Sequence, residues 1–168
     1  MKRFVLLLLA GIAAAGILAG TASSRAGDWQ LIQVGPFDTA CGSTVVHVTF
    51  PMNNEYYRLV ATLQDGTLQY QFAGSIRLNF ATDAGASVTV SASSPGTQFV
   101  HPDGTIEFMT FGRVVDVAGP GEADALGLPS NIVVLTGRND ITYHFDGTVS
   151  GTIGTVAEDV CAELGAVW

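Results

Sequence analysis

The most regular feature of this chain is an alternation of apolar and polar side chains with a period of two. Leu68, Tyr70 and Phe72 alternate with Gln69 and Gln71. Successive side chains of a β-strand face opposite sides of a sheet, so this pattern predicts a strand with one buried and one wet face. One wet face favours antiparallel pairing. The same reasoning predicts strands over residues 29–34, 44–50, 57–64, 67–73, 75–81, 86–92, 97–101, 105–117, 131–136, 140–145 and 148–154.

Three Asp-Gly-Thr triplets, beginning at Asp65, Asp103 and Asp146, punctuate these strands. Asp-Gly between alternating runs favours a hairpin, because a tight turn needs positive φ and glycine adopts it at little cost. We therefore predict positive φ at the glycine of each triplet. Inside the long 105–117 strand, Gly112 predicts a bulge or bend.

Many short strands with regular turns predict an all-β fold. Hairpin-length links favour an antiparallel meander that closes into a barrel, because closure leaves no exposed strand edge. A β-sandwich is the alternative. The segment 118–130 is the longest without a strand pattern and is expected to be a loop.

The C-terminus predicts one short helix. Thr155 and Glu158 have the spacing of a capping box, in which each side chain bonds the other's backbone N–H. Val160 and Leu164 then fall on one side at helical spacing, and Gly165 follows as a stop signal.

The N-terminal residues 1–26 have the three parts of a secretory signal peptide: a basic start, an apolar run and a small-residue site. Cleavage is expected after Ala26, with Ala22 as an alternative site, and retention as a membrane anchor is the rival interpretation. Residues 27–168 then form a single secreted, extracellular domain with no membrane contact after cleavage.

Cys41 and Cys161 lie near opposite ends of this exported domain, and they are the chain's two cysteines. Export places them in an oxidising compartment, where a disulfide forms and persists. The bridge would join the C-terminal helix to the strand that begins near residue 44. Closing so long a loop contributes about 4–5 kcal/mol in the chain-entropy model.

The exported domain is strongly acidic. Four arginines (Arg58, Arg77, Arg113 and Arg138) stand against all 15 carboxylates, so its net charge is 4 − 15 = −11. Such a surface repels nucleic acid and anionic lipid, which excludes nucleic acid as the expected partner. The simplest interpretation of the acidity is solubility outside the cell.

The sequence contains no reactive motif that stands out. The histidines (His47, His101 and His144) show no ligand spacing, so no metal site and no cofactor are expected. The acidic residues around the long loop (Asp116, Glu122 and Asp124) lack the Asp-x-Asp-x-Asp-Gly pattern of a calcium loop. No Gly-x-Ser-x-Gly nucleophile motif occurs.

Aromatic side chains on the apolar faces of the strands are the candidate ligand-binding residues. If the barrel is hollow, they line a cavity for a small apolar ligand; if it is filled, they are core. These residues are Tyr70, Phe72, Phe80, Tyr143 and Phe145.

The function that follows is a non-catalytic, secreted binding module of unknown ligand. The alternative is a small-barrel enzyme (an isomerase, cyclase or hydrolase) acting on an apolar or sugar-like substrate. A buried His or Arg inside the cavity would favour the enzyme.

The two cysteine segments carry a resemblance. Residues 38–42 (Asp-Thr-Ala-Cys-Gly) and the ending 158–164 (Glu-Asp-Val-Cys-Ala-Glu-Leu), with the Gly-rich strand 147–151, resemble uncharacterised small secreted proteins of high-GC Gram-positive bacteria. Those proteins have a Cys near the mature start and an Asp-Val-Cys-Ala-like end. The resemblance implies export and the bridge, and it implies no activity.

Overall fold

The computed structural model describes residues 27–119 and 121–166. It is an all-β structure in which ten strands form one sheet, and every strand pair is antiparallel. The predicted all-β class, the antiparallel pairing and the short C-terminal helix are confirmed. The expected signal peptide, residues 1–26, lies outside the described residues.

The strands are β1 (Gln30–Leu31), β2 (Phe37–Cys41), β3 (Thr44–Thr62), β4 (Leu68–Thr82), β5 (Ser87–Ala92), β6 (Gly96–Val100), β7 (Ile106–Val117), β8 (Ile132–Tyr143), β9 (Val149–Thr152) and β10 (Thr155–Asp159). Two short helices, α2 (Glu122–Leu126) and α3 (Val160–Glu163), complete the described elements.

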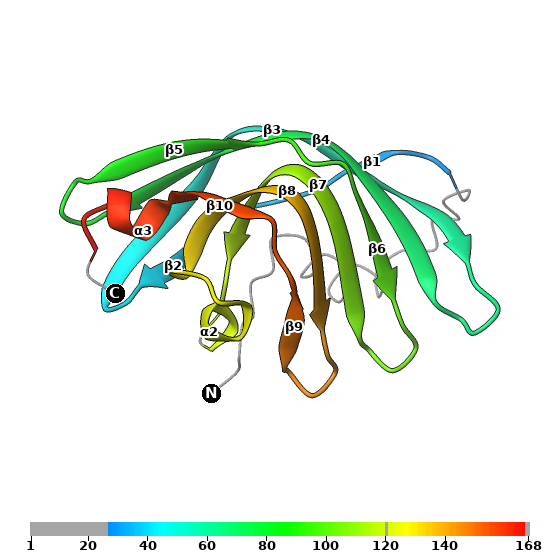
Figure 1. Cartoon of the computed structure of the whole chain (residues 1–168). Helices are drawn as coiled ribbons and strands as arrows, with labels where there is room; N and C mark the ends of the chain where they lie inside the picture. Colours follow the sequence, from blue (N-terminus) through cyan, green and yellow to red (C-terminus); the bar gives the residue numbers. More distant parts are fainter. Residues whose placement is uncertain (1–26, 120, 167–168) are drawn as a thin grey trace.

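The predicted closed barrel is wrong. The strand order is β1-β3-β4-β6-β7-β8-β10, with β2 beside β3, β5 beside β4 and β9 beside β8. Within the described residues, no ladder joins the β1 end of this order to the β10 end, so the sheet stays open. It bends over on itself instead, and the result is sandwich-like (Figure 1).

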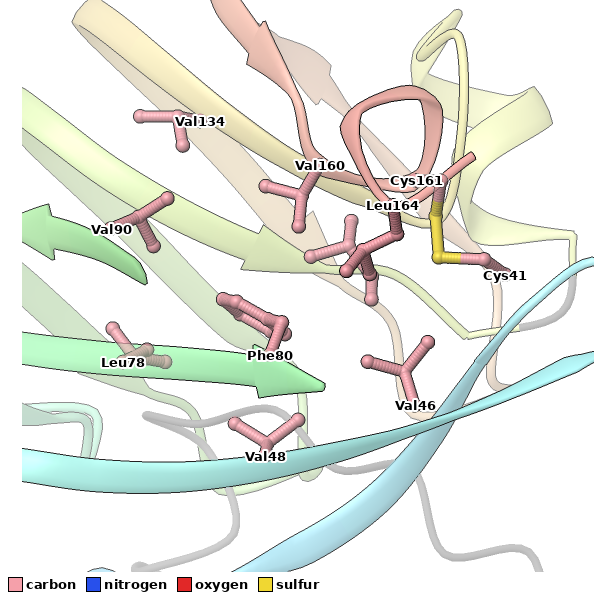
Figure 2. Close-up of a cluster of buried hydrophobic side chains, with 11 residues drawn as sticks. Cys41, Val46, Val48, Leu78, Phe80, Val90, Val134, Val160, Cys161 and Leu164 are labelled. Atoms are coloured by element: carbon pink, nitrogen blue, oxygen red, sulfur yellow. A yellow bond between two sulfur atoms is a disulfide. The ribbon is translucent and has the colours of Figure 1, made fainter. Parts of the chain in front are cut away.

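The bend produces two layers in one half of the molecule. Strand β5 and the adjoining parts of β3 and β4 lie above β8 and β7, as Figure 1 shows. A buried cluster that includes Val46, Phe80 and Val134 fills the space between the layers (Figure 2). Phe80 is fully buried there. Burying a side chain of this size stabilises the fold by roughly 1.5–3 kcal/mol.

Specific residues let the long strands bend. In β3, Pro51 falls where the pairing with β4 shifts register, between Thr49 and Met52. Proline has no N–H to donate to a ladder, so a bulge accommodates it. In β7 and β8, Gly112 pairs with Gly137, and both have positive φ (104° and 95°). The bend predicted at Gly112 therefore coincides with a glycine pair that spans two strands.

The three Asp-Gly-Thr turns form as predicted. Gly66, Gly104 and Gly147 have φ values of 89°, 91° and 85°. In each turn the Asp side chain accepts a hydrogen bond from the Thr backbone N–H, at 2.8–2.9 Å. These bonds favour the ionised carboxylate, and they lower the pKa of Asp65 and Asp103. At Asp146 the largest cause of the lowered pKa is the Thr148 hydroxyl, which donates a hydrogen bond to Oδ1 at 2.7 Å, and the backbone bond adds to it.

The C-terminal helix is shorter than its sequence pattern predicts. Thr155 and Glu158 lie on strand β10, so the predicted capping box does not form. The helix begins after Asp159, whose side chain accepts a hydrogen bond from the N–H of Ala162 at 3.1 Å. Pairing of β10 with β8 satisfies more backbone groups than a free helical turn would, and so it displaces the local helical preference.

The long segment 118–130 is also more ordered than expected. It contains α2, and Ala123, Leu126 and Leu128 pack against Val133 and Leu135 of β8. The first half of β8 is therefore buried on both faces, which explains its unbroken apolar run.

The predicted disulfide is present. Cys41 at the end of β2 and Cys161 in α3 are bonded, with their Cα atoms 5.4 Å apart and 120 residues of chain between them. Figure 2 shows the bridge at the edge of the buried cluster, where it joins the two layers.

Candidate functional site: an aromatic groove on the outer face of the sheet

The five aromatic residues expected around a ligand do not line one cavity. Phe80 lies in the cluster beside the disulfide. Tyr70, Phe72 and Tyr143 gather in a separate cluster around Ile32. Phe145 lies in the turn after β8 and is 74% exposed. The alternation suggested a strand to residue 145, but the strand ends at Tyr143 and the side chain then leaves the sheet.

The interior is nearly filled. Two inner cavities, of about 50 and 60 Å³, share Val114 and Val115 as a common wall. Each has room for only a few water molecules, whereas ligand pockets usually enclose roughly 300–1,000 Å³. Neither of these two cavities could hold a small apolar ligand of ordinary size.

Each inner cavity contains a buried carboxyl group. Asp116 lines the first, and its Oδ2 has no hydrogen-bond partner. Burial, together with the nearby charge of Glu122, raises the pKa of Asp116 to about 6. Glu55 lines the second, and burial raises its pKa to about 7. Neither His nor Arg lines these two cavities, so the feature that would favour an interior enzyme is absent from them.

These carboxyl groups predict an acidic optimum of stability. Their pKa values are raised in the folded state, so the folded protein binds the two protons more tightly than the unfolded chain. Their contribution to the stability of the fold is complete below the unfolded-state pKa values, 3.8 for Asp116 and 4.5 for Glu55. It is lost as the pH rises through the folded-state pKa values, about 6 for Asp116 and about 7 for Glu55. We expect the free energy of unfolding to fall by about 2 kcal/mol between pH 5 and pH 8.

Urea unfolding at a series of pH values checks this expectation. Glu55→Gln with Asp116→Asn should remove most of the decrease. The same substitution at an exposed carboxyl, Asp124→Asn, should leave it intact. A residual slope is expected from exposed His47, whose pKa is raised by hydrogen bonds to Asp83 and Asp38. A wild-type stability that rises steadily from pH 5 to pH 8 would contradict the assignment.

The three histidines and the acidic loop do not form a site. His47 bonds Asp38 and Asp83, His101 bonds Thr67 and Glu107, and His144 bonds Ser150. Within residues 27–119 and 121–166, no three His, Cys, Asp or Glu side chains are grouped so that they could hold a metal ion.

The outer face of the sheet carries a different arrangement. Strand pairing places Arg58 of β3 beside Gln71 of β4, and Gln71 beside Thr97 of β6. Trp29 directly precedes β1 and therefore lies next to Arg58. On the same face of β7 and β8, Phe111 pairs with Arg138. Trp29 and Phe111 thus stand on this outer face, which also carries the exposed side chains of Leu31 and Tyr56.

Between these two aromatic side chains lies an open groove of about 300 Å³. Trp29 and Phe111 are each 44% exposed. We call this feature the Trp29–Phe111 groove, and it is lined by Trp29, Gln71, Phe72, Ala73, Pro95, Gly96, Thr97 and Phe111. Small lining residues such as Ala73 and Gly96 fill little space, and this leaves a hollow between the two aromatic rings.

An arginine stacks on each aromatic ring. The guanidinium carbon of Arg58 lies 4.7 Å from the ring centroid of Trp29, and that of Arg138 lies 5.6 Å from the Phe111 centroid. Stacking of this kind stabilises an exposed ring by about 0.5–1 kcal/mol. The arginines themselves do not line the groove. They hold the rings in place, so the groove is formed before any ligand arrives.

Hydrogen bonds fix both arginines in turn. Arg58 donates from Nε and Nη2 to Oε1 of Gln71, at 3.1 and 2.6 Å. Arg138 donates from Nε to Oδ2 of Asp140 at 2.7 Å, and this bond raises the pKa of Arg138. The groove is thus bordered by two aromatic–arginine pairs, each anchored to the sheet.

The sequence interpretation missed this groove. Its signal was an aromatic residue on the polar side of a strand: Phe111 alternates in phase with Glu107 and Met109, not with buried Phe108. Trp29 lies at the start of a predicted strand and gave no such sign. Only strand pairing shows that the two residues face one hollow.

The chain matches no protein-family model, no curated protein and no solved structure. In the part of the chain that the structure describes, none of the helices has the length and apolar character needed to cross a membrane.

Proposed function

We propose that this chain is an exported, non-catalytic module that binds a carbohydrate chain in the Trp29–Phe111 groove. The observation that carries the proposal is the pair of exposed aromatic rings at the two sides of a preformed groove. Sugar rings have apolar C–H faces and polar edges. A site with aromatic walls and a few amide or hydroxyl groups matches both surfaces.

The polar groups of the groove have the needed chemistry. Gln71 has already committed its Oε1 to Arg58, so its NH₂ group remains as a donor. The hydroxyl of Thr97 can donate and accept. Planar amides and hydroxyls of this kind fix the orientation of a ligand whose binding energy comes mainly from apolar contact.

The length of the groove supports a chain of sugars. From β1 to β7 the sheet crosses four strand spacings, through β3, β4 and β6. At about 4.8 Å each, this gives roughly 19 Å. That length exceeds a single sugar ring, so an oligosaccharide would contact both aromatic residues.

The groove favours binding over catalysis. Its lining residues carry no carboxyl, imidazole, thiol or amine group. General acid–base and nucleophilic catalysis both require such groups within reach of the substrate. Inside the fold, the enzyme alternative would have to use Asp116 or Glu55, each in a cavity too small for a sugar.

Affinity electrophoresis through gels that contain single polysaccharides tests the proposal. Suitable probes are soluble β-glucan, xylan, galactan, alginate and polygalacturonate. We expect at least one of them to retard the protein. Trp29→Ala and Phe111→Ala should each weaken that binding at least about tenfold, as is typical when a central aromatic contact is removed.

The matched control is Phe145→Ala, which removes an exposed aromatic side chain that does not line the groove. It should bind like the wild type, and thermal unfolding should show all three variants folded. The proposed function would be refuted if every polysaccharide retards the Trp29→Ala variant as strongly as the wild type. It would also be refuted if no polysaccharide retards the wild type.

A further inference from the structure

We propose that the preferred occupant of the Trp29–Phe111 groove is an acidic oligosaccharide, a chain of uronic acid residues, whose carboxylate pairs with Arg58. This inference rests on the proposed function and names the class of sugar. It is carried by the position of Arg58 beside the groove and by the state of its charge.

Arg58 retains an uncompensated positive charge, unlike its neighbour across the groove. Arg138 pairs with Asp140, and Arg113 pairs with Glu158. Within residues 27–119 and 121–166, no carboxylate lies within 4.0 Å of the Arg58 guanidinium. Its partner is the neutral amide of Gln71. Two of the four arginines, Arg58 and Arg77, lie outside the ion pairs of the described residues, and of these two only Arg58 contacts residues that line the groove.

The geometry leaves Arg58 able to bind a carboxylate. Arginine has five N–H donors in a planar fork, and two of these bond Gln71. The remaining donors are held in one plane by the stack on Trp29, 4.7 Å from the ring centroid. A preorganised guanidinium pairs with carboxylates more strongly than a mobile cation, because little side-chain freedom is lost on binding.

Trp29 and Gln71 connect this charge to the groove. Both line it, and both contact Arg58. A sugar ring against Trp29 therefore places its substituents near the Arg58 guanidinium and the free amide of Gln71. A carboxylate on that ring would receive charge-assisted hydrogen bonds from Arg58, whereas an ester at the same position offers no charge.

The overall charge of the domain restricts the occupant further. A net charge of −11 repels dense polyanions such as nucleic acids. At the far side of the groove, Arg138 is neutralised by Asp140. The structure thus provides one cationic subsite, at the Trp29 end. A short uronic acid chain fits this pattern, because one carboxylate can occupy the cationic subsite while the net charge of the domain opposes long polyanions.

Paired probes, in which the carboxylate is either free or blocked as an uncharged methyl ester, test the inference. These are oligogalacturonate and its full methyl ester, and alginate oligomers with their methyl esters, titrated by calorimetry into the full exported domain. We expect at least one acid to bind about tenfold more tightly than its ester, because the ester loses the charged hydrogen bonds. Arg58→Gln should reduce this preference to nearly one.

The control for net charge is Arg77→Gln, an exposed arginine of β4 that does not line the groove. It should keep the preference for the acid. Arg58→Lys should keep part of it, because the charge remains and the fork is lost. Trp29→Ala should weaken binding of acid and ester alike.

The outcomes separate this inference from the proposed function. Equal binding of acid and ester by the wild type, or an acid preference that survives in Arg58→Gln, overturns the acidic ligand while the groove stands as a sugar site. Absence of binding to all four probes also overturns the acidic ligand. Binding of any probe that is unaffected by Trp29→Ala overturns the groove itself.

Discussion

Replacing Cys41 with Ala is expected to lower the free energy of unfolding by about 4–5 kcal/mol. The bridge closes a loop across 120 residues, so it removes a large part of the freedom of the unfolded chain. It also joins β2 to α3 at the point where the two layers meet. Loss of this much stability is a large fraction of the total for a single domain. Urea unfolding of the oxidised wild type and the variant measures the difference.

Two comparisons separate the bridge from the packing of its sulfur atoms, since both cysteines are buried. Cys161→Ala and the double variant should lose about as much as Cys41→Ala, because each breaks the same bond. The reduced wild type should also fall to a similar stability. The intact mass of exported protein should be two hydrogens below the dithiol mass. Two thiols that react in urea without a reductant would show that the bridge is not formed.

Gly74→Ala is expected to destabilise the fold by about 3–4 kcal/mol. Gly74 occupies the gap in β4 between Phe72, the last partner of β6, and Ile76, the last partner of β5. Its φ is 137°, and a Cβ atom there would lie 2.0 Å from the backbone oxygen of Asn54. Backbone cannot move aside without breaking the β3–β4 ladder, so both strain and overlap oppose a side chain.

The matched control is Gly35→Ala. Gly35 has no positive φ, and no atom lies within 4 Å of the position of its added Cβ. This change should leave the midpoint of thermal unfolding within a few degrees of the wild type, whereas Gly74→Ala should lower it by more than about 10 °C. If the two substitutions have equal effects, β4 does not need glycine at position 74, where its pairing partner changes from β6 to β5.

The sequence was sufficient for the elements that depend on local pattern. Period-two alternation located most strands, because each has one buried and one wet face. The Asp-Gly-Thr turns followed from the φ requirement of Gly66, Gly104 and Gly147. The disulfide followed from the export that residues 1–26 predict and from the presence of two cysteines. Each of these features is determined within a few residues or by a simple count.

Features that depend on distant pairing were not predictable. The sequence pattern predicts two strands, over residues 67–73 and 75–81, because Gly74 interrupts the alternation, but the structure has the single strand β4. Whether a sheet closes is decided by the pairing of its outermost strands, which no local pattern encodes. At the C-terminus, pairing with β8 placed Thr155 on a strand despite its helical signal.

The groove likewise combines a feature that the local pattern predicts with one that depends on distant strand pairing. That Phe111 faces away from the core is legible in the alternation of β7, but its position relative to Trp29 is not. The two residues are joined through β3, β4 and β6, and each pairing adds a register that the sequence leaves open. The sequence predicts a cavity inside a barrel. The sheet instead bends over a packed core, and the groove lies on its outer face.

The most direct test of the central claim uses the fluorescence of Trp29. The chain has two tryptophans, Trp29 and Trp168, so Trp168→Phe leaves Trp29 as the single tryptophan reporter. Titration with the polysaccharide or uronic acid oligomer that binds best should change the Trp29 emission saturably, with the same affinity that calorimetry gives. Adding Phe111→Ala should weaken that affinity at least about tenfold. Calorimetric binding that leaves the Trp29 emission unchanged would contradict the account, because the ligand would then lie elsewhere on the protein.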